Sequence, residues 1–282
     1  MKFNQSIEKI IRRRYSCRTY KNEPLDNKTI QKINSLLGIE HGIFKSEAKF
    51  ILIDTGMKNF EEKQKLGTYG MIKGARYFIV GTMNKESINL VDFGYLFEKI
   101  ILKMTELNLG TVWLGRAFNF DTFSKYANLK ESETIPAISP VGYVAEKKSI
   151  TEKFISWGIR ARNRKSWDKI FFEGNFTTPL TEENANYFAL PLEMIRLAPS
   201  ARNLQPWRIL KENNMIHFFL KTKSSYLIDA FSYMGLIDVG IALCHFDLMV
   251  NELGLEGDWE LKEPEIISKP ANYNYIASWI QK

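Results

Sequence analysis

Cysteine, histidine and long apolar runs are all scarce in this chain of 282 residues. The two cysteines, Cys17 and Cys244, offer no disulfide framework and favour a reducing compartment such as the cytoplasm. The three histidines, His41, His217 and His245, share no spacing typical of metal ligands, so no metal site is expected. No apolar run approaches the roughly 20 residues of a membrane-spanning helix. The N-terminal sequence contains no apolar stretch of signal-peptide length, so secretion is not expected.

The composition is that of a soluble globular protein with a sizeable core, since 45% of the residues are hydrophobic and 25% are charged. The charge is unevenly distributed along the chain. Residues 1–174 contain 30 Lys and Arg against 19 Asp and Glu, whereas residues 175–282 contain 9 against 13. The net charges are therefore +11 and −4, which add to the overall +7. An anionic ligand is expected to be attracted mainly by the first part of the chain.

Two distant segments are related in sequence, which indicates an internal duplication. Residues 90–113 align without a gap with residues 236–259, and 8 of the 24 positions are identical. Each segment reads as a long apolar-striped helix followed by a short strand, and such wide apolar faces predict centrally buried helices. The identical pairs are Leu90/Leu236, Asp92/Asp238, Gly94/Gly240, Leu102/Leu248, Glu106/Glu252, Leu107/Leu253, Leu109/Leu255 and Trp113/Trp259.

Strands and helices interleave along the whole chain, which indicates an α+β or mixed α/β class. The segment 173–184 is rich in turn-forming residues and is the expected linker. We therefore predict two related halves, 1–174 and 175–282, that pack as an internal pseudo-dimer. The expected helices cover 4–13, 26–38 and 181–200, and the expected strands cover 49–54, 75–82, 135–146 and 207–221, the last as a hairpin.

Two basic motifs could bind an anion. "RYSCR" (14–18) places arginine, serine and arginine at alternate positions, so in an extended segment these side chains could converge on one phosphate. "RARNRK" (160–165) could complete a phosphate cage. From the patterns alone, solvated basic runs are the simpler interpretation. A nucleic-acid surface is less consistent with the sequence, because no aromatic residues alternate with the basic ones.

Two turns could approach a flat ligand. In "PSARNLQPW" (199–207) a proline ends a helix, and serine, asparagine and glutamine follow before a strand begins. A turn with this many amide and hydroxyl groups could recognise a planar polar heterocycle and its sugar. In "NLGTVWLGR" (108–116) a short apolar strand ends at Gly115, where glycine permits close approach of the backbone. A buried strand with a glycine turn explains this second motif equally well.

Together these motifs resemble those of the FMN-dependent nitroreductase superfamily, and the resemblance covers nearly the whole chain. The family pattern R-x-S-x-R matches 14–18, and P-S-x-x-N-x-Q-P-W matches 199–207. The pattern L-G-x-G-T-x-W-L-G is similar to 107–115, a P-x-G-Y strand matches 140–143, and a basic motif matches "RNR" at 162–164. The resemblance implies an α+β fold of antiparallel-rich mixed sheets with long central helices.

The resemblance also implies an FMN site and assigns its residues. Arginines of both basic motifs would hold the phosphate, the turn at 199–203 would contact the ribityl chain and ring edge, and the backbone at 114–115 would lie by the reactive side of the ring. No catalytic side chain is named, because the redox chemistry is that of the flavin. The implied cofactor-binding residues are Arg14, Tyr15, Ser16, Arg18, Leu114, Gly115, Arg162, Arg164, Pro199, Ser200, Ala201 and Asn203.

This chain departs from the family pattern in the order and number of its motifs. The first half has residues 38–50 where the P-S-x-x-N turn belongs, and the second half has no R-x-S-x-R before its turn. The sequence Trp-Glu-Leu at 259–261 replaces the Trp-Leu-Gly of 113–115. One composite FMN site is therefore expected to be complete and its counterpart to be dismantled. Because the family dimer would be fused in one chain, the protein could function as a monomer.

The implied function is electron transfer from NADH or NADPH, through the flavin, to a small organic acceptor such as a nitroaromatic or quinone, in a ping-pong cycle. A flavin-binding carrier or sensor without reductase turnover is the alternative. A basic nucleic-acid binder would explain the arginines but not the turn at 199–207. The expected partner is thus a small-molecule substrate, with neither nucleic acid nor membrane.

Overall fold

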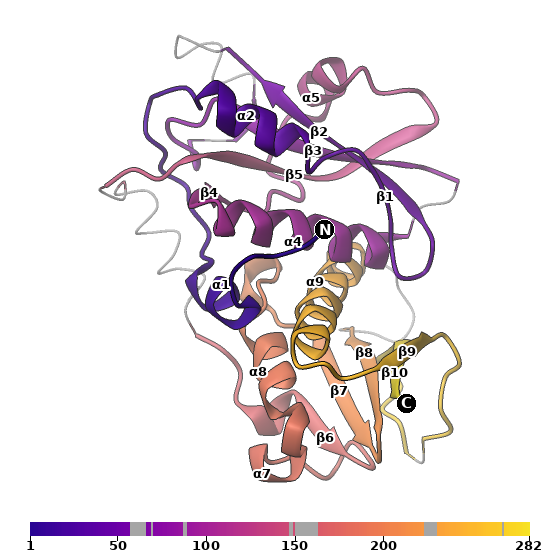
Figure 1. Ribbon diagram of the computed structural model, residues 1–282. Coiled ribbons are helices and arrows are strands. Elements are labelled where there is room, and N and C mark those ends of the chain that lie inside the picture. The colour runs from indigo at the N-terminus through magenta and orange to yellow at the C-terminus, as the bar shows by residue number, and fades with distance from the viewer. Residues whose placement is uncertain are drawn as a thin grey trace. The chain divides into compact units, whose positions relative to one another are not determined.

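The computed structural model describes residues 1–56, 66–68, 70–86, 89–146, 149, 163–222, 230–266 and 268–282. The chain divides into two compact units, and each is built on one five-stranded sheet (Figure 1). Unit 1 comprises residues 1–5 and 13–161, and unit 2 comprises residues 6–12 and 162–282.

The division at residues 161 and 162 precedes the predicted boundary at 174 and 175, because β6 (Phe171–Glu173) pairs in parallel with β7 (Trp207–Glu212) of unit 2. The prediction of a linker at 173–184 was wrong. The N–H of Gly174 donates to the carbonyl of Lys211, and the N–H of Leu180 donates to the carbonyl of Phe171. The turn-rich segment is therefore hydrogen-bonded to strands of the second sheet and does not connect the two units.

The sheet of unit 1 has the order β1-β2-β3-β5-β4, and all of its pairings are antiparallel. The long helix α4 (Leu90–Glu106) runs along one face, whereas α2 (Asn27–Asn34) and α5 (Phe120–Ala127) lie on the other (Figure 1). The strands are β1 (Ile39–His41), β2 (Glu47–Asp54), β3 (Tyr77–Asn84), β4 (Leu109–Thr111) and β5 (Glu133–Tyr143).

Local sequence explains where these helices begin. The side chain of Asp26 accepts a hydrogen bond from the N–H of Thr29 and so caps α2. Asn89 caps α4 in the same way, accepting from the N–H groups of Val91 and Asp92. All residues of α4 except Lys99 are buried, which confirms the prediction of a central helix for this segment.

The sheet of unit 2 has the order β6-β7-β8-β10-β9, with antiparallel pairing except between β6 and β7. The predicted hairpin is confirmed, since β7 turns at Asn213 (φ 53°) into β8. These antiparallel-rich mixed sheets with long helices confirm the predicted α+β class. The remaining elements are α1 (Ile7–Arg13), which lies mostly in this unit, α7 (Glu182–Ala185), α8 (Ala189–Leu197), β8 (Met215–Lys221), α9 (Ala230–Glu252), β9 (Gly257–Glu260) and β10 (Tyr273–Gln281).

The prediction of a single helix over 181–200 was wrong, because the segment forms two helices, α7 and α8, separated by a break. Thr181 caps α7 through the N–H of Asn184, as its sequence suggests, but the helix ends after one turn. Asn186 takes a positive φ of 52°, which interrupts the helical path, and a short 3₁₀ turn leads into α8.

Several features of unit 1 recur in unit 2, and the helix ends do so at a spacing of 146 residues. The strand order β2-β3-β5-β4 reappears as β7-β8-β10-β9. At the end of α4, the N–H of Asn108 donates to Thr105, and at the end of α9 the N–H of Gly254 donates to Asn251. Both Asn108 (φ 61°) and Gly254 (φ 69°) are left-handed, which is a common way to end a helix.

Helix α9 is apolar enough to resemble a membrane span. Among the described residues, one helical segment, Tyr233–Glu252, is long and apolar enough to cross a membrane. However, 78% of its most apolar stretch is buried within the protein. Such burial is typical of a central helix in a globular fold.

Candidate functional site

In unit 1 the segment that carries the R-x-S-x-R motif runs beside the edge strand β4. Ser16 forms a parallel bridge with Thr111, and the N–H of Cys17 donates to the Thr111 carbonyl at 2.8 Å. Cys17 is 1% exposed, which confirms that it points into the fold. Arg18 is also buried and directs its guanidinium to the carbonyl of Ser16. The motif is therefore fixed by backbone bonds, and its arginines are not solvated surface groups.

Arg14 is a buried cation beside a buried carboxylate. Its side chain is 6% exposed, and its Nε lies 3.9 Å from Oε1 of Glu98, which is fully buried in α4. The other oxygen of Glu98 accepts a hydrogen bond from the indole of Trp113 at 2.7 Å. Burial lowers the pKa of the Arg14 guanidinium, and the charge of Glu98 opposes that shift. Within the described part of the chain, Nε of Arg14 is buried and has no hydrogen-bond partner.

A pocket of about 160 Å³ lies against this arginine. Arg13, Arg14 and Tyr15 form one side of it, and residues 108–110, at the end of α4 and the start of β4, form another. Glycine is required at position 110, because a Cβ there would lie 2.7 Å from Sγ of Cys17. Two arginines line this small pocket, and their positive charges favour an anion there.

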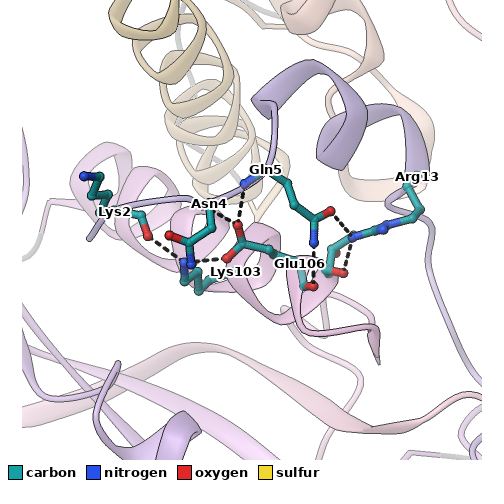
Figure 2. Close-up of polar contacts among 7 residues, drawn as sticks. Lys2, Asn4, Gln5, Arg13, Lys103 and Glu106 are labelled. Carbon is teal, nitrogen blue, oxygen red and sulfur yellow. Dashed lines mark hydrogen bonds and ion pairs between the residues drawn. The ribbon is translucent and has the colours of Figure 1, made fainter.

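Arg13 is held in place by the end of α4 (Figure 2). Its guanidinium donates to the carbonyl of Thr105 at 2.8 Å and to the side chain of Gln5 at 3.2 Å. The Glu106 carboxylate accepts the N–H groups of Asn4 and Gln5, at 2.6 and 2.9 Å. Residues 1–5 are thus tied to the helix end that also anchors Arg13, immediately before the motif.

A buried ion pair completes this cluster (Figure 2). Lys103 and Glu106, each with 5% of its side chain exposed, pair on one face of α4, and Lys103 also donates to the carbonyl of Lys2. Burial raises the pKa of Glu106, but hydrogen bonds from Lys103, Asn4 and Gln5 outweigh burial and lower it overall.

Leu114 and Gly115 follow β4. Leu114 is 5% exposed, packs in a core cluster of unit 1, and exchanges two backbone hydrogen bonds with Ile138. Its N–H is therefore already engaged, so any backbone contact to a ligand at this turn would come from Gly115, which is partly exposed.

In unit 2 the predicted turn is sharply bent. Arg202, Asn203 and Gln205 have φ values of 51°, 58° and 47°, all in the left-handed region that costs non-glycine residues energy. The hydroxyl of Ser200 accepts from the N–H of Gln205 at 2.8 Å and closes the turn. The N–H of Ala201 donates to both carboxylate oxygens of Asp238, at 3.0 and 3.1 Å. Strain of this kind is often found at functional sites, where the surroundings must hold it.

The basic segment 163–165 lies against this turn, which brings two of the predicted motifs of unit 2 together. Arg164 donates to the side-chain oxygen of Asn203 at 3.2 Å and to the carbonyl of Leu197 at 3.0 Å. Asn203 in turn donates to the carbonyl of Asn163 at 2.7 Å. The other predicted arginine of this motif, Arg162, lies outside the described residues.

Lys165 continues the same contact. Its N–H donates to the side chain of Gln205, and its ammonium donates to the carbonyls of Leu204 and Gln205. Burial lowers the pKa of Lys165 to about 8, and the positive charges of Arg208 and Lys221 add to that shift.

Replacing Lys165 by methionine should remove a pH dependence of stability. The folded chain releases the Lys165 proton at about pH 8, whereas an unfolded lysine keeps it to its ordinary value of 10.5. Between these values the unfolded state holds more protons, so the stability of the wild type rises with pH relative to K165M. The melting temperature of the wild type should therefore rise relative to that of K165M between pH 8 and pH 10.5. A difference between the two melting temperatures that stays constant over this pH range would contradict the prediction.

Unit 2 has its own cavity at the position equivalent to the arginine pocket. This cavity of about 400 Å³ is lined by Asn251, Leu255 and Glu256, which lie 146 residues after Thr105, Leu109 and Gly110. Asp247 and Lys282 also line it. Two acidic residues, Asp247 and Glu256, thus line this cavity, whereas Arg13 and Arg14 line the pocket of unit 1, so this cavity is less suited to an anion.

The sequence reasoning missed three contributors to these sites. Glu98 and Asp238 each lie within an apolar helix, where a lone acid gives no functional signal. Lys165 belongs to the basic motif 160–165, but its contact with the turn at 199–207 depends on a chain reversal that no local pattern reveals. Among the described residues no group of three or more His, Cys, Asp or Glu could hold a metal ion.

Comparison with known proteins identifies the family. A family model described as "Putative TM nitroreductase" matches residues 6–250. The chain therefore belongs to this nitroreductase family, and the resemblance noted in its motifs is confirmed at that level. No curated protein matches the sequence significantly.

One solved structure matches the fold over nearly the whole chain. A crystal structure of a "putative nitroreductase" from Thermotoga maritima matches with a TM-score of 0.61 and 20% identity, over 99% of this chain and 95% of that one. At this identity the likeness shows the fold alone. A nitroreductase family protein from Clostridium difficile matches 54% of this chain and 90% of its own, at 21% identity and a TM-score of 0.39. A nitroreductase with bound FMN from Desulfitobacterium hafniense matches 51% of this chain and 92% of its own, at 21% identity and a TM-score of 0.40.

Proposed function

We propose that this protein is an FMN-dependent oxidoreductase that passes electrons from NADH or NADPH to a small organic acceptor. Membership of the nitroreductase family supports the reaction class. The main observation in support of FMN is the buried Arg14. Its Nε has no hydrogen-bond partner in the described part of the chain, and the residue lines a pocket together with a second arginine.

The negative charge of the FMN phosphate complements the positive charge of the arginine pocket. Arg13 and Arg14 bring two positive charges, and Glu98 offsets one of them. A phosphate monoester with a charge near −2 would gain charge-assisted hydrogen bonds there. We assign the phosphate to Arg14, with Tyr15, Ser16 and Arg18 contributing from the same backbone segment.

A second set of residues, in unit 2, is assigned on its own evidence. The turn Pro199–Asn203 presents its polar groups in a strained conformation, and Arg164 is bonded to Asn203 within it. We assign Pro199, Ser200, Ala201 and Asn203 to the ribityl chain and ring edge. Arg162 and Arg164 are assigned to the phosphate. The backbone at Leu114 and Gly115 is assigned a place beside the ring, with Gly115 supplying any hydrogen bond to it.

We further infer that the chain arose by duplication and holds one flavin. The repeated strand order and the repeated helix-end bonds support the duplication. Glu256, at the position of Gly110, supports the loss of the second anion site. A fused pair can function as a monomer, and two buried cysteines, Cys17 and Cys244, are consistent with a cytoplasmic location.

When bound, FMN supplies the redox chemistry, namely the transfer of two electrons from NAD(P)H to a nitroaromatic or quinone in alternating half-reactions. The protein's own residues bind and orient the cofactor. Neither a catalytic acid nor a nucleophile is required of them.

Steady-state kinetics test this function. With FMN-loaded protein, NADH and NADPH are each varied against a quinone and a nitroaromatic, and the oxidation of the nicotinamide is followed. A ping-pong cycle gives parallel double-reciprocal lines. FMN-loaded protein that oxidises neither nicotinamide with any acceptor would instead be a flavin-binding carrier or sensor.

A further inference from the structure

Asp238 is a buried carboxylate in the middle of α9, and it touches the strained turn of unit 2. It is 3% exposed, and both of its oxygens accept from the N–H of Ala201. Burying a carboxylate is costly unless it is well paired, and an apolar residue at this point of an apolar helix would avoid the cost. The acid is therefore better explained by what it holds than by its contribution to stability.

The turn needs such an anchor. Three of its residues are left-handed without being glycine, at a cost of about 1–3 kcal/mol each. On its C-terminal side the turn is tied by Lys165 and by Arg208, whose guanidinium donates to the Gln205 carbonyl. On its N-terminal side the Ala201 N–H is fixed by Asp238.

The equivalent acid of unit 1 makes the same kind of contact. Asp92 lies 146 residues before Asp238, is fully buried in α4, and accepts the N–H groups of Phe44 and Ser46 at 3.0 and 2.9 Å. Space is left for it by Gly42, where a Cβ would lie 2.0 Å from Cγ of Asp92. In both units, therefore, a helix aspartate holds the loop that precedes a strand of the sheet, β2 in unit 1 and β7 in unit 2.

The two loops differ in what they carry. The loop held by Asp92 lacks the P-S-x-x-N motif, whereas the loop held by Asp238 contains it. We infer that Asp238 is a positioning residue for the cofactor: it fixes the peptide of Ala201 and thereby places Ser200 and Asn203 to bind FMN. This inference rests on the proposed function, because it takes the turn to be a flavin contact. In this role Asp238 acts through the Ala201 N–H, which it engages and which is therefore not a donor to the flavin.

The test compares matched variants of the two aspartates. D238A removes the acceptor, and we expect the dissociation constant for FMN, measured by quenching of flavin fluorescence, to rise at least tenfold. D238N should restore most of the affinity, because its amide oxygen can still accept from Ala201. D92A should lower the melting temperature comparably, yet leave the FMN dissociation constant within about twofold of the wild type.

A second measurement separates this inference from the proposed function. Without flavin, hydrogen exchange in a peptide spanning 199–206 should be faster in D238A than in the wild type and D92A. If wild type binds no FMN, the proposed function fails, whatever the exchange shows. If wild type binds FMN and D238A binds it equally well, or D92A weakens binding as much as D238A, the positioning role is overturned while the function stands.

Discussion

Replacing Arg14 by methionine should raise the dissociation constant for FMN about a hundredfold. The phosphate would lose two charge-assisted hydrogen bonds, each contributing about 1.5 kcal/mol, and every 1.4 kcal/mol is a factor of ten. Arg14 is the arginine for which this effect should be large, because its side chain is 6% exposed and the residue lines the anion pocket. Arg12 pairs on the surface with Glu8, so R12M should leave FMN affinity unchanged.

A double variant separates binding from folding. R14M alone takes the nearby cation from the buried Glu98, which should cost about 3 kcal/mol of stability. R14M/E98Q removes both charges, and the amide oxygen can still accept from Trp113. The double variant should regain much of the melting temperature but none of the FMN affinity. Recovered affinity would show that Arg14 acts through the fold and not on the phosphate.

Replacing Lys103 by methionine should destabilise the protein by about 3 kcal/mol, which is the usual cost of leaving a buried charge without its partner. Lys103 and Glu106 are each 5% exposed, and the same pair holds residues 2, 4 and 5 against α4 (Figure 2). Urea unfolding measures the loss. The surface pair Arg12–Glu8, with side chains 48% and 36% exposed, is the matched control, and R12M should cost under about 1 kcal/mol.

Acid should reduce the difference between wild type and K103M. The hydrogen bonds of Glu106 hold its folded pKa below the ordinary 4.5. A carboxylate with a depressed pKa stabilises the fold above its unfolded pKa, and this contribution is lost as the pH falls through the folded value. The stability gap should therefore be full at neutral pH and shrink below about pH 4.5. A gap of equal size in acid would mean that Lys103 acts through packing alone.

Motifs with strong local chemistry were predictable from the sequence. The capped start of α2, the hairpin turn at Asn213 and the buried central helix α4 each follow from residues close in sequence. The alignment of residues 90–113 with 236–259 also led to the prediction of two related halves. Periodicity and capping act over one or two turns, so these features needed no tertiary information.

The features that failed or were missed depend on contacts between distant residues. The segment at 173–184 has the composition of a linker, but parallel pairing of β6 with β7 draws it into the second sheet. Asp92 and Asp238 appeared among the identities without a role, because only the fold places loop N–H groups over their carboxylates. The left-handed residues of the turn at 199–207 are likewise imposed by surrounding bonds and not by glycine.

The visible spectrum of the purified protein, followed by anaerobic addition of NADH or NADPH, tests the central claim most directly. We expect a yellow protein with about one FMN per chain, whose flavin absorbance bleaches when the nicotinamide is added and returns when a quinone follows. A protein that stays colourless after incubation with FMN would contradict the cofactor assignment. Bound flavin that neither nicotinamide bleaches would contradict the reductase.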